Sequence, residues 1–130
     1  MYPDARGCPM VEQSVEEYKL TLRKLAVRDD RFIDTLLSEE RANPTLSGID
    51  LRSHALVRIA ALIAVDAAPP SYMSAVEAGL KAGASYDEMV GTLIAVMPIV
   101  GVARVVSAAP NLGLALGYDV HEALELVEDR

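Results

Sequence analysis

Residues 89–118, MVGTLIAVMPIVGVARVVSAAPNLGLALGY, decide how this chain folds. They contain one formally charged side chain, that of Arg104, between the acidic pair Asp87 and Glu88 and the acidic Asp119. A segment this apolar is buried in lipid, in its own domain or between copies of the chain, and an arginine inside it needs an anionic partner. The stretch therefore directs the search for both the fold and the functional site.

Residues 89–109 are long enough to cross a bilayer, which takes about 20 residues. However, Arg104 lies well inside this segment, and a central arginine costs roughly 2.5–3.5 kcal/mol on insertion scales. Gly91, Pro98 and Gly101 also interrupt it, and no cluster of basic or aromatic residues flanks it. We therefore expect no membrane partner and a stretch that is buried within a helical bundle and between subunits.

Composition predicts a single domain over residues 1–130, because the chain has 130 residues of which 52% are hydrophobic. The net charge of -7 excludes a nucleic-acid partner, since phosphate binding needs a basic surface. Cys8 is the only cysteine, so no intrachain disulfide or cysteine-based zinc motif can form. The first ten residues lack the pattern of a signal peptide, and we expect a cytoplasmic protein.

Helical periodicity recurs along the chain and predicts an all-α fold, a bundle of antiparallel helical hairpins. We expect four parts: a flexible lead-in over 1–12, an N-terminal helical hairpin over 13–42, a core over 50–118 and a C-terminal helix over 119–130.

Capping signals predict where several helices begin. Capping boxes of the form Ser-x-x-Glu start at Ser14, Ser74 and Ser85, and Asp50 and Asp119 precede two further apolar periodic segments. Asp29 or Asp30 is the expected cap of the second helix, which is predicted to end near Arg41, before a loop over 43–48.

Prolines predict where helices end. The Pro69 and Pro70 pair is expected to close the helix that starts at Asp50, with the next helix starting at Ser71 or Ser74. Pro98 is expected to kink or break the following helix, which resumes near Ile99 and ends at Pro110.

Three consecutive segments carry a family resemblance: DLRSHALVRIAALIAV from Asp50, VEAGLKAGASYDEMV from Val76 and IVGVARVVSAA from Ile99. In order and spacing they resemble the carboxymuconolactone decarboxylase family, which includes the AhpD-type alkylhydroperoxidases. The resemblance covers residues 50–118. It implies an all-α fold whose helical hairpins assemble into homotrimers or hexamers. It also implies either decarboxylation of a lactone from aromatic degradation or thiol-dependent reduction of peroxides.

The chain departs from the peroxidase members of that family at four positions. The family's Cys-x-x-Cys pair and histidine fall at Ala68, Ser71 and Ala75, and its assisting glutamate falls at Leu56. Without a thiolate nucleophile the peroxide reaction cannot run, so a peroxidase would depend on Cys8. The decarboxylase members need no cysteine, but they commonly keep a histidine at the position of Ala75.

Two arginines are candidates to bind a substrate carboxylate. Arg104 would act as a bidentate donor, and Arg58 is a second basic residue in the core segment. The alternative for Arg104 is a structural ion pair with an acid such as Asp66. Asp66 lies at the C-terminal end of its helix, where a carboxylate is unfavourable and needs a compensating partner.

Three residues are candidates to move a proton: His54, Asp66 and Tyr72. His54 shares a helical face with Arg58, and the alternative is a solvated histidine in the first turn. The alternative for Tyr72 is a packed ring with its hydroxyl at the edge of a pocket.

These observations predict cofactor-free acid–base chemistry, decarboxylation or isomerisation, on a small carboxylated molecule. Arg104 would hold the anion, and no metal ligands are expected. The alternative is a family member without catalytic activity that acts as an oligomeric assembly or binding protein. A thiol peroxidase that uses Cys8 is a third alternative.

Overall fold

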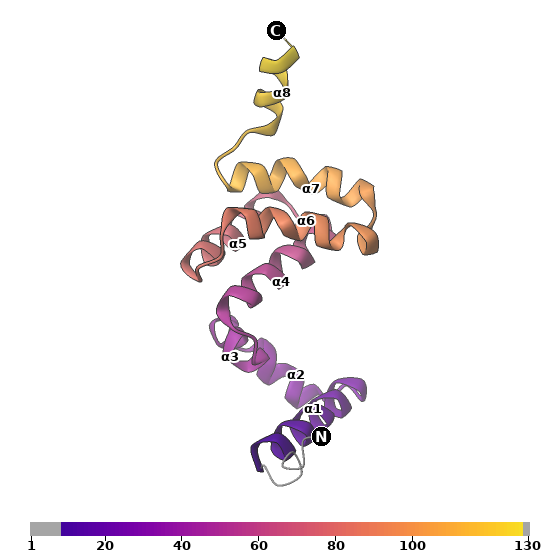
Figure 1. Cartoon of the computed structure of the whole chain (residues 1–130). Coiled ribbons are helices and arrows are strands. Elements are labelled where there is room, and N and C mark those ends of the chain that lie inside the picture. The colour runs from indigo at the N-terminus through magenta and orange to yellow at the C-terminus, as the bar shows by residue number, and fades with distance from the viewer. Residues whose placement is uncertain (1–8, 129–130) are drawn as a thin grey trace, which may run out of the picture. The chain divides into compact units, whose positions relative to one another are not determined.

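The computed structural model describes residues 9–128, with side chains described for residues 16–127 (Figure 1). The described residues form eight α-helices and one short 3-10 helix, and they contain no strand. The predicted all-α class is therefore confirmed. The chain divides into two compact units, Met1–Ser47 and Gly48–Arg130. Cys8 and the first eight residues of the expected lead-in lie outside the described part of the chain.

The first unit consists of α1 (Pro9–Ala26), α2 (Asp30–Leu37), the 3-10 helix (Glu40–Ala42) and α3 (Asn43–Ser47). Asp29 caps α2, as predicted, because its carboxylate accepts a hydrogen bond from the backbone N–H of Phe32 at 3.1 Å. No side chain described in residues 16–47 is buried. This unit therefore has no hydrophobic core of its own among those residues.

Three expectations for the first unit are wrong, and one of them is the end of α2, which lies at Leu37 and not near Arg41. The first helix begins at Pro9, not at Ser14, and residues 43–47 form α3 where a loop was expected. Pro44 is tolerated in α3 because it lies in the first turn, where a backbone N–H has no partner within the helix.

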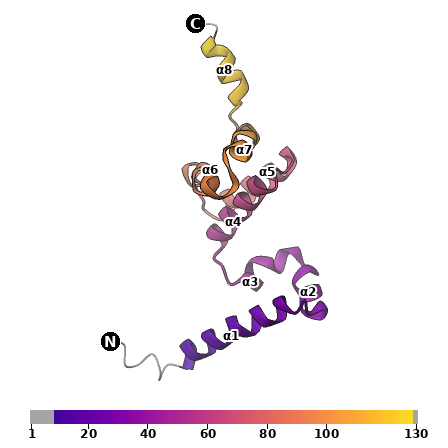
Figure 2. The same cartoon turned by 90° about the vertical axis from the view of Figure 1, so that its right-hand side faces the viewer.

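The second unit contains the hydrophobic core. Its helices are α4 (Leu51–Ala64), α5 (Pro69–Lys81), α6 (Tyr86–Val100), α7 (Val102–Ala115) and α8 (Val120–Glu128). α4 packs against α5 and α6, and α7 packs against the same two helices (Figures 1 and 2). The largest fully buried side chains are those of Ile59, Ile63, Tyr72, Met89 and Leu112.

Small residues let α4, α5 and α6 approach closely. A Cβ atom added to Gly79 of α5 would lie 3.1 Å from Sδ of Met89 and 3.7 Å from Cβ of Ala55. A larger side chain at position 79 would therefore push the helices apart. This packing agrees with the aliphatic, tryptophan-free composition of the chain.

Three of the predicted caps in this unit are confirmed. Asp50 accepts a hydrogen bond from the Ser53 N–H at 3.0 Å, and Asp119 accepts one from the Glu122 N–H at 3.0 Å. Ser85 forms the predicted capping box with the residue three positions later. Short-range hydrogen bonding fixes these helix starts, which explains why the sequence alone predicts them.

The predictions from proline are wrong in this unit. α5 begins at Pro69, since proline suits the first position of a helix, whereas the sequence placed its start at Ser71 or Ser74. α6 continues through Pro98 to Val100, and the chain breaks instead at Gly101, which has a φ of 91°. α7 likewise continues through Pro110 to Ala115.

Within residues 9–128, no helix is both long enough and apolar enough to cross a lipid bilayer.

Candidate functional site

The end of α4 holds a backbone conformation that is unusual for its residue. The N–H of Ala67 donates to the carbonyl of Leu62 at 3.0 Å, and the N–H of Asp66 donates to that of Ile63 at 3.3 Å. These two bonds form a Schellman motif, in which the residue after the helix cap adopts a left-handed conformation. That residue is Asp66, with a φ of 54°.

Two other helices of the same unit end with the same motif and place glycine at this position. They are α5, which ends with Gly83 at a φ of 87°, and α7, which ends with Gly117 at a φ of 87°. Glycine adopts this conformation without strain, whereas a residue with a Cβ atom pays roughly 1–2 kcal/mol. Asp66 also places a carboxylate at the negative end of the α4 dipole. Both local effects disfavour aspartate here.

The Asp66 carboxylate connects the end of α4 to α7. The Ser107 hydroxyl donates a hydrogen bond to Oδ1 of Asp66 at 2.8 Å, and Nη1 of Arg104 lies 3.7 Å from Oδ2. The side chains of Arg104 and Asp66 are 49% and 45% exposed. Arg104 therefore pairs with Asp66, one of the two partners that the sequence left open, but in a position that water can reach.

Tyr72 of α5 carries a buried hydroxyl group within the electrostatic influence of Asp66. Its side chain belongs to the core, and its hydroxyl oxygen has no hydrogen-bond partner among the described residues. Burial raises the pKa of Tyr72, and the negative charge of Asp66 raises it further. The hydroxyl therefore keeps its proton at neutral pH. We call Asp66, Tyr72, Arg104 and Ser107 the Asp66 cluster.

The other predicted site residues lie away from this cluster. His54 stands in the first turn of α4, twelve positions before Asp66, which corresponds to about 18 Å along a helix. Arg58 is eight positions before Asp66, or about 12 Å. His54 is also buried, with 9% of its surface exposed, so its expected solvation is wrong.

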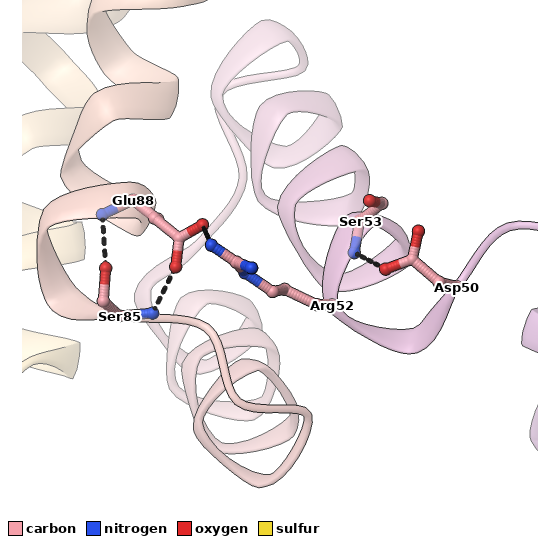
Figure 3. A network of polar contacts seen from close by, with 5 residues as sticks. All are labelled: Asp50, Arg52, Ser53, Ser85 and Glu88. Atoms are coloured by element: carbon pink, nitrogen blue, oxygen red, sulfur yellow. Dashed lines mark hydrogen bonds and ion pairs between the residues drawn. The ribbon is translucent and has the colours of Figure 1, made fainter.

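A second polar network joins the first turns of α4 and α6 (Figure 3). Arg52 forms an ion pair with Glu88, and Glu88 also accepts a hydrogen bond from the backbone N–H of Ser85 at 2.9 Å. The hydrogen bond from Arg52 lowers the pKa of Glu88, and the backbone hydrogen bond of Ser85 lowers it further. Each charge in this network has a partner, so we assign the network to structure and not to chemistry.

Sequence reasoning found three of the four residues of the Asp66 cluster. Ser107 was missed because a serine inside a helical segment gives no signal of its own. Its spacing of three residues from Arg104 places both on one face of α7, and that spacing is the one clue available in the sequence.

The described residues contain no group of three or more histidine, cysteine, aspartate or glutamate side chains that could hold a metal ion. Comparisons of the chain with protein-family models, with curated proteins and with solved structures gave no match.

Proposed function

We propose that this protein binds a small carboxylated molecule at the Asp66 cluster and moves a proton on it without a cofactor, in the manner expected of a carboxymuconolactone decarboxylase-like protein. One observation carries the proposal. The buried Tyr72 hydroxyl has no partner among the described residues, and the charge of Asp66, which forms the half-exposed pair with Arg104, raises its pKa in addition to burial. A buried hydroxyl without a partner is uncommon and marks a site where a ligand would complete the hydrogen bonding.

Several hydrogen-bond donors of the cluster have no acceptor among the described residues. Arg104 has five N–H groups. Its one polar contact within the described chain is the ion pair with Asp66, and the distance of 3.7 Å between Nη1 and Oδ2 is too long for a hydrogen bond. The Tyr72 hydroxyl is a further donor without an acceptor. A carboxylate supplies acceptors to both kinds of donor, and arginine binds it in a bidentate manner.

Two groups of the cluster suit proton transfer. Asp66 can accept a proton from the bound molecule and return it at another carbon, and Tyr72, which stays protonated at neutral pH, can donate a hydrogen bond to the negative charge that develops in between. A decarboxylation that is driven by desolvation needs a site from which water is excluded. Asp66 and Arg104 are half-exposed, so water reaches this site. The geometry therefore favours isomerisation over decarboxylation.

The binding part of the proposal is tested by comparing acids with their neutral amides. Propionate and benzoate should raise the melting temperature of the protein, whereas propionamide and benzamide should not, since ligands of the native state stabilise it by mass action. Arg104→Gln should abolish the response. Arg58→Gln, which removes an arginine of α4, is the control and should keep the response to the acids. An equal response in the Arg104→Gln variant would rule out this site.

A second candidate function is self-assembly into a homotrimer or hexamer. The observation that favours it is the number of exposed apolar side chains on α6 and the start of α7, which are Val90, Ile94, Ile99, Val102 and Val106. No charged residue lies between Glu88 and Arg104 in the sequence. An interface on this face would let copies of an acidic chain meet without repulsion between like charges.

Assembly is tested by sedimentation velocity. Ile94→Glu introduces a charge on the apolar face and should shift the protein toward the monomer. Ala78→Glu introduces the same charge at an exposed position of α5 and should leave the assembly unchanged. A wild-type protein that sediments as a monomer at high concentration would contradict this candidate.

A further inference from the structure

The carboxylate of Asp66 is not needed to end α4. The same turn ends α5 and α7 with Gly83 and Gly117, which fit the left-handed conformation without strain. The ion pair with Arg104 offsets little of the strain at Asp66, because both side chains are about half exposed and water screens their attraction. Arg28 adopts the same left-handed conformation at the end of α1, with a φ of 54°, but its positive charge suits the end of a helix. Asp66 combines the conformation with an unfavourable charge, and that combination points to a role in binding.

The two oxygens of this carboxylate differ in what they contact. Oδ1 accepts the hydrogen bond from Ser107 and is held by it. Oδ2 faces Nη1 of Arg104 at 3.7 Å and accepts no hydrogen bond from the described residues. The chain thus presents a negative acceptor and a positive donor side by side, and solvent reaches both.

We propose that the Asp66 cluster recognises small acids with an ammonium or hydroxyl group on the carbon next to the carboxylate, held by Arg104 through the carboxylate and by Oδ2 of Asp66 through that group. The inference rests on the proposed function and names its ligand class. A donor group next to the carboxylate matches the arrangement of the two protein side chains, and the charge of Asp66 favours ammonium over hydroxyl.

The same geometry selects against other acids. A simple carboxylate such as propionate can use Arg104, but it leaves Oδ2 of Asp66 without a donor. A dicarboxylate such as succinate brings a second negative charge toward Asp66, and like charges at this distance repel. The hydroxyl of Tyr72 is the remaining donor of the cluster, and it is buried without a hydrogen-bond partner among the described residues.

The test is a titration followed by NMR chemical shifts, with alanine, lactate, propionate and succinate as probes. For the wild-type protein we expect alanine and lactate to bind about tenfold more tightly than propionate, as one charge-assisted hydrogen bond implies, and succinate to bind most weakly. Asp66→Asn should remove the preference for alanine and lactate while propionate still binds. Arg104→Gln should abolish binding of all four probes.

Asp66→Gly provides a second variant that keeps the fold, since glycine ends α5 and α7 in the same conformation. Asp66→Gly should also lose the preference for alanine and lactate over propionate. If wild type binds propionate as tightly as alanine, the ligand class is wrong and the proposed carboxylate site stands. If Asp66→Gly, which removes the acceptor altogether, leaves the preference intact, Asp66 does not contact the ligand. If no probe binds, the proposed function fails together with the inference.

Discussion

At the scale of single residues, Asp66 combines backbone strain with two polar contacts, and substitution can separate these effects. Asp66→Ala keeps the strain and loses both contacts, so we expect it to lower the free energy of unfolding by about 1–2 kcal/mol. Asp66→Gly loses the same contacts but relieves the strain, and it should be more stable than Asp66→Ala by about 1 kcal/mol. Urea unfolding of the two variants measures the difference. Equal stability would show that the conformation at position 66 carries no strain.

The ion pair between Arg52 and Glu88 predicts a dependence of stability on pH. The pKa of Glu88 in the folded protein lies below its ordinary value of 4.5, because Arg52 donates a hydrogen bond to the carboxylate. Its contribution to stability is therefore complete above about pH 4.5 and is lost as the pH falls through the lowered pKa.

Glu88→Gln should thus destabilise the protein at neutral pH, and the difference from wild type should shrink below pH 4.5. Glutamine can still accept the hydrogen bond from the Ser85 N–H, so the variant removes the charge and keeps the cap. Glu77→Gln, which removes an exposed carboxylate from α5, is the control. Thermal unfolding from pH 3 to pH 7 measures both, and a difference that stays constant with pH would contradict the prediction.

The residues of the candidate site were partly predictable, for identifiable reasons. Asp66 stood out because a carboxylate at the end of a helix breaks a local rule, and local rules can be read from sequence. The burial of His54 and the missing partner of the Tyr72 hydroxyl could not be predicted, because both depend on how α4, α5 and α7 pack. Ser107 could not be predicted for the same reason, because it belongs to the site through its hydrogen bond to Asp66, which lies 41 positions earlier in the chain.

At the scale of helices, the aspartate caps and the capping box at Ser85 were predicted correctly. The capping boxes predicted at Ser14 and Ser74 lie inside α1 and α5, and the prolines did not end their helices. Asp29, Asp50 and Ser85 cap helices in the structure because each acts on backbone groups within three residues. Pro98 does not end α6, because it costs one hydrogen bond within the helix and packing with the neighbouring helices outweighs that cost. Its exposed position also lets water solvate the carbonyl that it leaves without a donor.

Two glycines, one inside this helix and one directly after it, predict opposite effects of the same substitution. Gly91 lies inside α6 and Gly101 lies between α6 and α7, and an added Cβ atom would meet no other atom within 4 Å at either position. Gly91→Ala should raise the free energy of unfolding by about 0.5–1 kcal/mol, since alanine favours a helix. Gly101→Ala should lower it by about 1–3 kcal/mol, because a φ of 91° strains any residue with a side chain.

Thermal and chemical unfolding of these two alanine variants measure the difference directly. Because neither substitution changes a packing contact, the comparison isolates backbone conformation from volume. A stabilising effect of Gly101→Ala would mean that the connection between α6 and α7 adopts a different conformation in solution.

At the scale of the whole molecule, the hydrophobic core lies entirely in the second unit. The buried cluster runs from Ile59 to Leu112, and the partly buried residues that pack on it also fall between residues 56 and 116. Sequence reasoning placed the core over 50–118 because the family resemblance covers those residues. The first unit shows helical periodicity as well, but the periodicity alone does not show whether the apolar face of a helix is buried against another helix.

This distribution predicts that residues 48–130 fold without the first unit. The fragment keeps the four helices that surround the core and both networks at the ends of α4, so hydrophobic burial, the dominant stabilising term, is retained. We expect cooperative thermal unfolding by circular dichroism and a melting temperature close to that of the full chain. Residues 1–47, whose described side chains are all at least partly exposed, should be far less helical in isolation. A broad, uncooperative transition of the 48–130 fragment would show that the first unit contributes to the stability of the core.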